Sequence, residues 1–232
     1  MDASLNASER IKATVPLSVP PDSPATLQQL ETSARRLDLR NATTPGMAFL
    51  AVEDERSGKC LGAGPIVQRT WDRASGTVDL QAVGILDGWL ASRMILPPDA
   101  FGILQNHSVW AATSNMSVLK TSFFLPDGTP DTALNSTWSN LSWRTIAKRI
   151  VQQAVSWPSS SVPIVFEDDV SGANQVTYLG TDFKSVATAL GEIIDRDNGC
   201  DIQFLPERTP ARLGSQWRMV TGNPRLSSPV DR

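Results

Sequence analysis

The sequence predicts an α+β fold that is rich in β-strands. In its first half, apolar and polar residues alternate over short segments, which is the pattern of strands with one buried face. In its second half, two segments repeat apolar residues with the period of an amphipathic helix, and short apolar runs follow them. The chain has 232 residues, 41% of them hydrophobic, so it can bury a core without a metal or a disulfide.

Strands account for most of the first half. Apolar side chains at every second position predict a strand over 11–19, and Pro16 restricts it to an edge or a bent strand. Further strands are expected at 47–53, 60–68, 69–73 and 77–83, and the turns ERSGK and ASG would close two hairpins.

The middle of the chain is less regular. A short helical pattern lies within 20–46, and Leu86, Leu90 and Met94 predict an amphipathic helix over 84–95 that ends before two prolines. Residues 99–135 carry turn signals such as PDGTPD, so we expect an irregular connector with one strand near 117–125.

The second half predicts a small α/β unit. Ser142 is a suitable N-cap for a helix over 142–156, whose apolar stripe would turn Arg144, Lys148, Arg149 and Gln152 towards solvent. A second helix is expected over 182–197, with Phe183 on its apolar stripe and Gly199 at its C-cap. Strands are expected at 174–179, 200–205 and 216–221.

These patterns divide the chain into four parts. We expect a β-rich domain at 1–98, an irregular connector at 99–135, a small α/β domain at 136–205, and a returning strand with a C-terminal tail at 206–232.

Charge and hydropathy exclude several classes of protein. The formal net charge is -3, which gives no electrostatic reason for binding nucleic acid or an anionic membrane. The N-terminus lacks the basic start and apolar run of a secretory signal, and residues 82–96 are too short to span a bilayer, so we expect a soluble chain. Asn-x-Ser/Thr occurs at Asn6, Asn41, Asn106, Asn115, Asn135 and Asn140, which we interpret as turns in a Ser/Thr-rich protein and not as glycosylation sites.

Histidine and cysteine offer little for catalysis. His107 is the only histidine, and its surroundings, QNHSVW, contain no nucleophile motif, so we expect a packing or exposed role. Cys60 and Cys200 are 140 positions apart with no CxxC spacing, and we expect two small buried side chains in preference to a disulfide.

Other candidate motifs also favour structural interpretations. The acidic run Glu167, Asp168 and Asp169 could bind calcium but lacks the alternating oxygen ligands of an EF-hand, so a solvated turn is expected. Asp195, Arg196 and Asp197 resemble the polar end of a helix, and Gly62, Gly64 and Pro65 a bulge or tight bend. The seven tryptophans could stack sugars or bases. Trp71, Trp138, Trp143 and Trp157 flank the ends of predicted elements, where packing is the commoner role. We therefore predict no catalytic, cofactor-binding or metal-binding residues.

The order of features resembles one family. GxGPI from Gly62 to Ile66 is followed by RTWDRASGTVDLQA and GILDGWLASRMILP, and later by WRTIAKRIVQQAV and YLGTDFKSVATALGEIIDRDNGCDIQF. This order is similar to that of the minor tail proteins that form the baseplate hub, or tail tip, of long-tailed phages of actinobacteria. The resemblance covers most of the chain and consists of loose patterns without a catalytic signature.

The resemblance implies a β-barrel-like N-terminal module with a small α/β domain, assembled as a ring, with a homotrimer expected. It implies a non-enzymatic structural subunit of the virion that closes the tail tube and contacts the distal tail protein, the tape-measure protein and other tail-tip proteins. It carries over no active-site residues or cofactor. Two alternatives are a carbohydrate- or receptor-binding module and the non-catalytic front of a tail-associated cell-wall hydrolase.

Overall fold

A computed structural model describes residues 10–16, 49–72, 74–97, 123–156, 162–209 and 215–222. The chain forms two compact units. The β unit comprises residues 1–89 and 204–218, and the α/β unit comprises residues 90–203 and 219–232. The described residues are rich in strands with few helices, which confirms the predicted β-rich α+β class.

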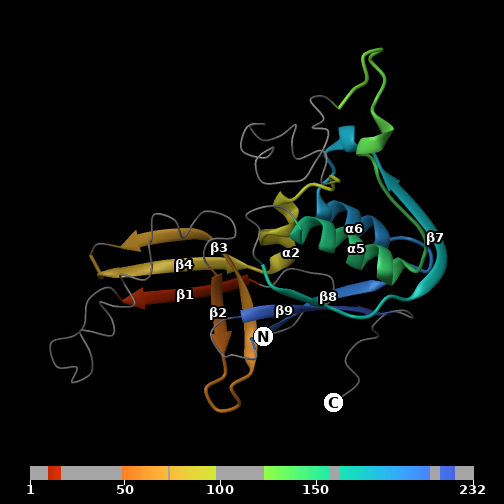
Figure 1. Ribbon diagram of the computed structural model, residues 1–232. Helices are drawn as coiled ribbons and strands as arrows, with labels where there is room; N and C mark the ends of the chain where they lie inside the picture. Colours follow the sequence, from red (N-terminus) through yellow and green to blue (C-terminus); the bar gives the residue numbers. More distant parts are fainter. Residues whose placement is uncertain are drawn as a thin grey trace. The chain divides into compact units, whose positions relative to one another are not determined.

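The β unit is built on an antiparallel four-stranded sheet. Its strands are β1 (Arg10–Pro16), β2 (Phe49–Glu53), β3 (Cys60–Asp72) and β4 (Thr77–Val83), in the order β1-β4-β3-β2 (Figure 1). β1 therefore lies at an edge, as the proline at its end predicted. Its partner register runs from Arg10 opposite Val83 to Pro16 opposite Thr77.

One long strand, β3, replaces the two strands expected at 60–68 and 69–73. Its first part pairs with β2, from Cys60 to Pro65, and its second part pairs with β4. The register shifts between Ile66 and Gln68, where a bulge lets the chain change direction without a turn. The prediction of two strands was wrong because the chain passes through the bulge without leaving the sheet. The result is the bent, half-barrel sheet of Figure 1.

Gly64, which belongs to the motif Gly62, Gly64 and Pro65, lies close to this bend. A Cβ atom on Gly64 would collide with the backbone carbonyl of Val83, so only glycine allows the two strands to approach at this point. Beyond the bend, Ile66, Val78 and Leu80 form a buried cluster on the inner face of the sheet.

A strand segment near the C-terminus, which includes Trp217, contributes to the same unit. Trp217 is 2% exposed, and its ring lies 5.2 Å from that of Phe49, measured between centroids. Its indole nitrogen donates a hydrogen bond of 3.4 Å to the carbonyl of Ala63. Residues more than 150 positions apart in the sequence thus share one core.

The helix predicted over 84–95 is wrong. The structure has a single turn, α2 (Ile85–Gly88), and a 3-10 turn, η1 (Leu90–Ser92). Gly88 weakens any longer helix, and the next backbone groups pair outside it. Within the α/β unit, the carbonyl of Arg93 accepts from Val186 N at 2.8 Å and Ile95 N donates to Lys184 O at 2.9 Å.

The α/β unit combines short strands with two helices. It contains η2 (Thr132–Leu134), β5 (Ser136–Leu141), α5 (Trp143–Val155), β6 (Ile164–Phe166), β7 (Ser171–Tyr178), η3 (Gly180–Asp182) and α6 (Val186–Ile194). β5 pairs with β7, and β6 belongs to a sheet of order β6-β9-β8 with β8 (Asp201–Arg208) and β9 (Ser215–Gly222). β5 and β6 were not predicted. β8 and β9 each have residues in both units.

Serine caps define both helices. Ser142 accepts a hydrogen bond from Thr145 N, as predicted, and Ser185 accepts one from Thr188 N. α6 therefore begins after Phe183, which has a left-handed backbone (φ +47°) and is exposed instead of lying on the apolar stripe. The helix ends at Ile194, so Gly199 is not its C-cap.

Several predictions lie outside the described residues. These are the helical pattern within 20–46, most of the strand near 117–125, His107, Trp157 and the sequons at Asn6, Asn41, Asn106 and Asn115.

We expect Gly64→Ala to lower the free energy of unfolding by about 1–3 kcal/mol, because the added methyl group meets a carbonyl that belongs to a paired strand. Urea denaturation measures the change. Gly191→Ala is the matched control, since nothing lies within 4 Å of a Cβ atom there. This helical substitution should raise stability by about 0.5–1 kcal/mol. Equal effects at both positions would contradict the close approach at Gly64.

Leu190→Ala should cost roughly 2–5 kcal/mol, because Leu190 is fully buried and lies in α6, a helix that packs against α5. The same denaturation experiment measures it. A cost below about 0.5 kcal/mol, typical of surface positions, would show that this face of α6 is not buried.

Candidate functional site

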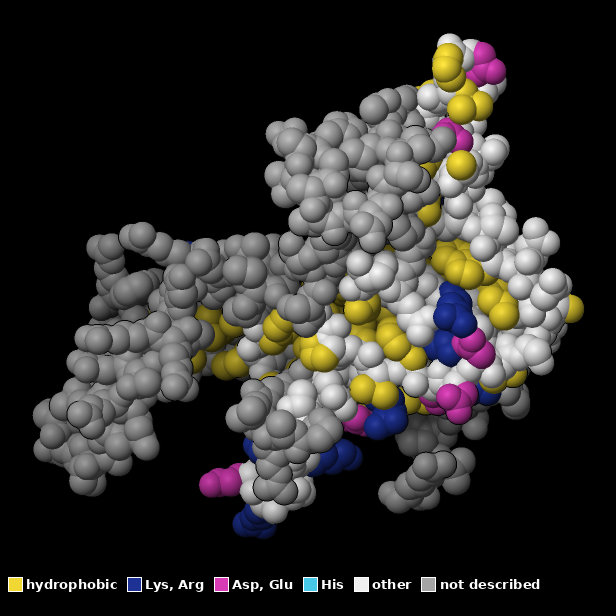
Figure 2. Space-filling model, viewed as in Figure 1, with side chains coloured by type: hydrophobic (Ala, Val, Ile, Leu, Met, Phe, Trp, Pro, Cys, Tyr) yellow, Lys and Arg dark blue, Asp and Glu magenta, His cyan; other side chains and the backbone are white. Residues whose placement is uncertain are grey.

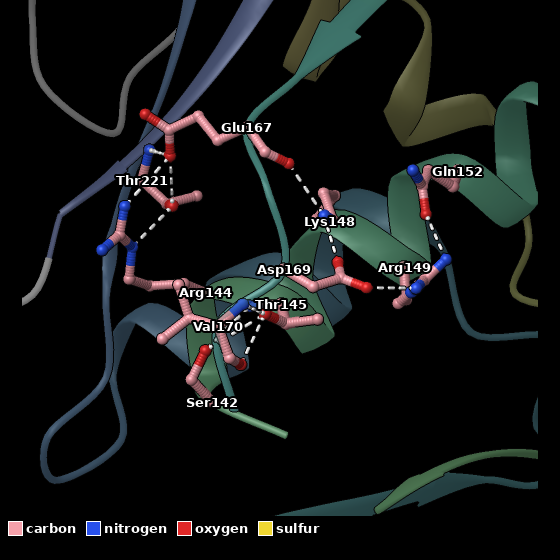
Figure 3. A network of polar contacts seen from close by, with 10 residues as sticks. All are labelled: Ser142, Arg144, Thr145, Lys148, Arg149, Gln152, Glu167, Asp169, Val170 and Thr221. Carbon is pink, nitrogen blue, oxygen red and sulfur yellow. Dashed lines mark hydrogen bonds and ion pairs between the residues drawn. The ribbon is translucent and has the colours of Figure 1, made fainter. Parts of the chain in front are cut away.

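The most extensive polar cluster lies in the α/β unit, between helix α5 and the segment that joins β6 to β7. Basic and acidic side chains lie side by side over α5 in the space-filling view (Figure 2). We call the contacts of Arg144, Lys148 and Arg149 with Glu167 and Asp169 the charged clamp; Figure 3 shows them together with their polar neighbours.

One end of the clamp is organised by Glu167. Its Oε2 atom accepts from the guanidinium of Arg144 at 3.2 Å and from the hydroxyl of Thr221 at 3.0 Å. Arg144 Nε donates to the same hydroxyl at 3.0 Å. This carboxylate therefore joins the first turn of α5 to strand β9 (Figure 3).

The other end is organised by Lys148. Its ammonium donates to the backbone carbonyl of Glu167 at 2.8 Å and forms an ion pair with Asp169, which also pairs with Arg149. Lys148 is only 8% exposed, so the prediction that it faces solvent was wrong. Its long apolar stem packs in the core while its charge reaches the acidic segment.

Thr145 fastens the middle of the segment. Its hydroxyl donates to the carbonyl of Val170 at 2.8 Å and accepts from Val170 N at 2.7 Å. Gly172 then passes so close that a Cβ atom would lie 2.6 Å from Ser142 N. The segment after β6 is thus held along the N-terminal turns of α5 by side-chain and backbone contacts.

The charges of the clamp satisfy one another. Lys148 comes first among the groups that hold the pKa of Asp169 below its usual range. Asp168 lines a small hollow beside the clamp, together with Arg144, Lys148, Glu167, Met219 and Thr221. Within the described ranges, no three His, Cys, Asp or Glu residues are placed to hold a metal ion. The arrangement is suited to joining secondary-structure elements.

The cysteines are both buried, and neither forms a disulfide. Burial raises the pKa of Cys200 to about 11. At neutral pH this side chain is therefore a thiol, the form that is a poor nucleophile and metal ligand.

The tryptophans described by the structure act mainly in packing. Trp89 and Trp217 are almost fully buried, and Trp143 lies beneath the guanidinium of Arg196 at 4.6 Å from the ring centroid. Trp138 is half-buried against Tyr178, with 6.3 Å between ring centroids. Arg196 is flanked by Asp195 and Asp197 at the exposed end of α6, as predicted. The side chain of Trp71 lies outside the described part of the structure.

Sequence reasoning missed the clamp as a unit. It treated Arg144, Lys148 and Arg149 as a solvent-facing set and the acidic run as a separate turn. The available signal was the opposite charge of two nearby segments, because three cations on one predicted helix are followed, further along the chain, by three consecutive acids. Thr145 and Thr221 carried no signal, since their roles depend on the approach of distant backbone.

Comparisons with known proteins give limited information. No protein-family model matches the chain, and no curated protein matches it. Among solved structures, the chain is similar to the E. coli c3393 protein, described as a component of the type VI secretion system with structural similarity to the T4 bacteriophage tail proteins gp27 and gp5. The identity is 11% and the TM-score 0.43, over 93% of this chain and 42% of that protein's length.

Fold and site together define a strand-rich α+β protein with a bent antiparallel sheet and a cluster of charged side chains that form ion pairs with one another. None of the helices that the structure describes has the length and apolar character needed to cross a membrane.

We expect Asp169→Asn to destabilise the protein at pH 7, because it removes the partner of Lys148 and Arg149. Since the folded state lowers the pKa of Asp169, its contribution is fully present above about pH 4 and is lost as pH falls through the folded pKa. The difference in urea midpoint between wild type and Asp169→Asn should therefore shrink below about pH 4.

Asp168→Asn is the matched control, because Asp168 is exposed and takes no part in the ion pairs of the clamp. Equal destabilisation by the two variants, or a difference that does not shrink as the pH falls below about 4, would contradict the clamp.

Proposed function

We propose that this protein is a structural subunit of the tail tip or baseplate hub of a long-tailed phage, where it closes the tail tube and anchors distal tail components. The observation that carries the proposal is the open sheet of the β unit, in which the described part of edge strand β1 pairs with β4 alone. A regular edge strand is a site of pairing with other chains unless something covers it. The order of sequence features, which resembles that of minor tail proteins of actinobacteriophages, supports the same conclusion.

A closed ring would cover such edges by symmetry. In a homotrimeric ring, each subunit presents one surface to the next, so every copy makes the same two contacts. We place the β unit at these contacts. The distal tail protein, the tape-measure protein and other tail-tip proteins would be its further partners in the virion.

The proposed role is non-catalytic. It is supported by the mutual pairing of the charges in the clamp and by the raised pKa of Cys200, which leave these groups with structural roles. The segment from Glu167 to Val170 is fastened to α5 by ion pairs and hydrogen bonds, which suits a subunit that works through its shape.

Assembly is the decisive test. We expect mass photometry and sedimentation velocity to show a homotrimer, or a complex with tail-tip partners. A structure of that assembly should show interfaces above about 2,000 Å² in total, as in permanent assemblies. A protein that stays monomeric with these partners and is retained on glycan resin would instead support the carbohydrate-binding alternative.

A further inference from the structure

Asn198 and Gly199 form the one Asn-Gly dipeptide of the sequence, and they lie in the turn between α6 and β8. In such a dipeptide the backbone nitrogen of glycine can attack the side-chain amide of asparagine, because glycine has no side chain to obstruct the approach. The amide nitrogen is then lost as ammonia. The backbone conformation decides whether the two groups can meet, so the geometry of this turn determines the reactivity of Asn198.

The turn favours asparagine or glycine at position 198. Gly199 N donates a hydrogen bond of 2.8 Å to Arg196 O, which closes a four-residue turn. Asn198 is the third residue of that turn and has φ +59°, in the left-handed region. A positive φ at this position of a turn is adopted mainly by glycine and asparagine. The backbone conformation therefore limits which residues can stand at position 198.

Position 199 requires glycine for a different reason. A Cβ atom there would lie 2.2 Å from Ile193 O and 2.9 Å from both Arg196 O and Ile194 O. These carbonyls belong to the end of α6 and to the turn, so a side chain would fit only if the end of the helix moved. The two constraints together place the least hindered backbone nitrogen directly after an asparagine.

In the folded chain the same contacts oppose the reaction. To reach Cγ of Asn198, the nitrogen of Gly199 must leave its hydrogen bond to Arg196 O and turn towards the asparagine side chain. Gly199 is buried against three carbonyls, and the next two residues, Cys200 and Asp201, are 1% and 3% exposed. The attack therefore requires that the turn and the start of β8 open locally.

We propose that Asn198 is a deamidation site that the fold protects and that reacts when this turn opens. A bond forms between Gly199 N and Asn198 Cγ. The bond from Cγ to the side-chain nitrogen breaks, and that nitrogen takes up the proton of the Gly199 amide and leaves as ammonia. Water then hydrolyses the succinimide ring. Cleavage of one ring C–N bond gives aspartate, and cleavage of the other gives isoaspartate, in which the main chain continues through Cβ.

The products do not fit the turn. Isoaspartate adds one methylene group to the main chain directly before Gly199, which has no space to move between the three carbonyls. Aspartate keeps the normal backbone but adds a negative charge to a turn that already carries Asp195 and Asp197. A chain that has formed isoaspartate should therefore fail to refold, so that a transient opening becomes irreversible. The inference does not depend on the proposed function.

Mass spectrometry of the full-length protein tests the protection. Samples are incubated in one mildly alkaline buffer with and without guanidinium chloride, which unfolds the chain, and the tryptic peptide 197–208 is followed over time. We expect deamidation of Asn198 to be at least about tenfold slower in the folded protein, because only its opened fraction reacts. Asn174 is the internal control, since the side chain of Gln175 hinders attack, and it should stay intact in both samples.

Two results would overturn the proposal. Equal rates with and without denaturant would show that the fold does not protect Asn198. An Asn198 that stays intact in the unfolded chain would show that it is not a deamidation site.

Refolding measures the effect of the product. After prolonged incubation in denaturant, wild type should lose refoldable protein in proportion to its isoaspartate content, which isoaspartyl methyltransferase quantifies. Asn198→Gly keeps a residue suited to positive φ and removes the reactive amide, so its refoldable fraction should stay constant. Equal losses in wild type and Asn198→Gly, or native protein recovered with isoaspartate at position 198, would refute the effect of the product on the turn.

Discussion

The β unit depends on one constraint, which is that a single strand must pair with different partners along its two halves. β3 meets that requirement by shifting register between Ile66 and Gln68 and by carrying glycine where Val83 approaches. Any side chain at Gly64 would separate the strands at the point where the sheet bends. The sheet order, the inner core of Ile66, Val78 and Leu80, and the position of β1 at the edge all follow from this bend.

In the α/β unit, ion pairs between helix α5 and the acidic segment after β6 hold the structure together. Three cations on one helix would repel each other if they were left in solvent on a single face, and Lys148 would be costly to bury alone. The acidic segment after β6 removes both costs, because Glu167 and Asp169 lie against these cations and the hydroxyl of Thr145 holds the backbone between them. The clamp therefore fixes a loop that would otherwise have few buried contacts.

Sequence reasoning succeeded where the determinant was local. Alternation identified β1 and β4, an apolar run identified β2, and the hydroxyl of Ser142 identified the start of α5. It failed where distant backbone decided the outcome: residues 84–95 have a helical pattern, yet Arg93 and Ile95 bond to residues 184–186. The clamp was not predicted because the direction of a lysine on a helix depends on what packs against it. Phe183 was wrongly assigned to the apolar stripe of the second helix, because that helix, α6, begins only after its N-cap Ser185.

The contribution of Trp217 to the core around Phe49 and Ala63 has a consequence for synthesis of the chain. A ribosome makes the 154 peptide units that separate Ala63 from Trp217 in roughly 8–30 s at 5–20 residues per second. During that interval the nascent sheet lacks the indole that later covers it, and its edges are open to the wrong strands. A protein built this way is expected to need a chaperone, or a low rate of translation initiation, to keep neighbouring nascent chains apart until the last hairpin emerges.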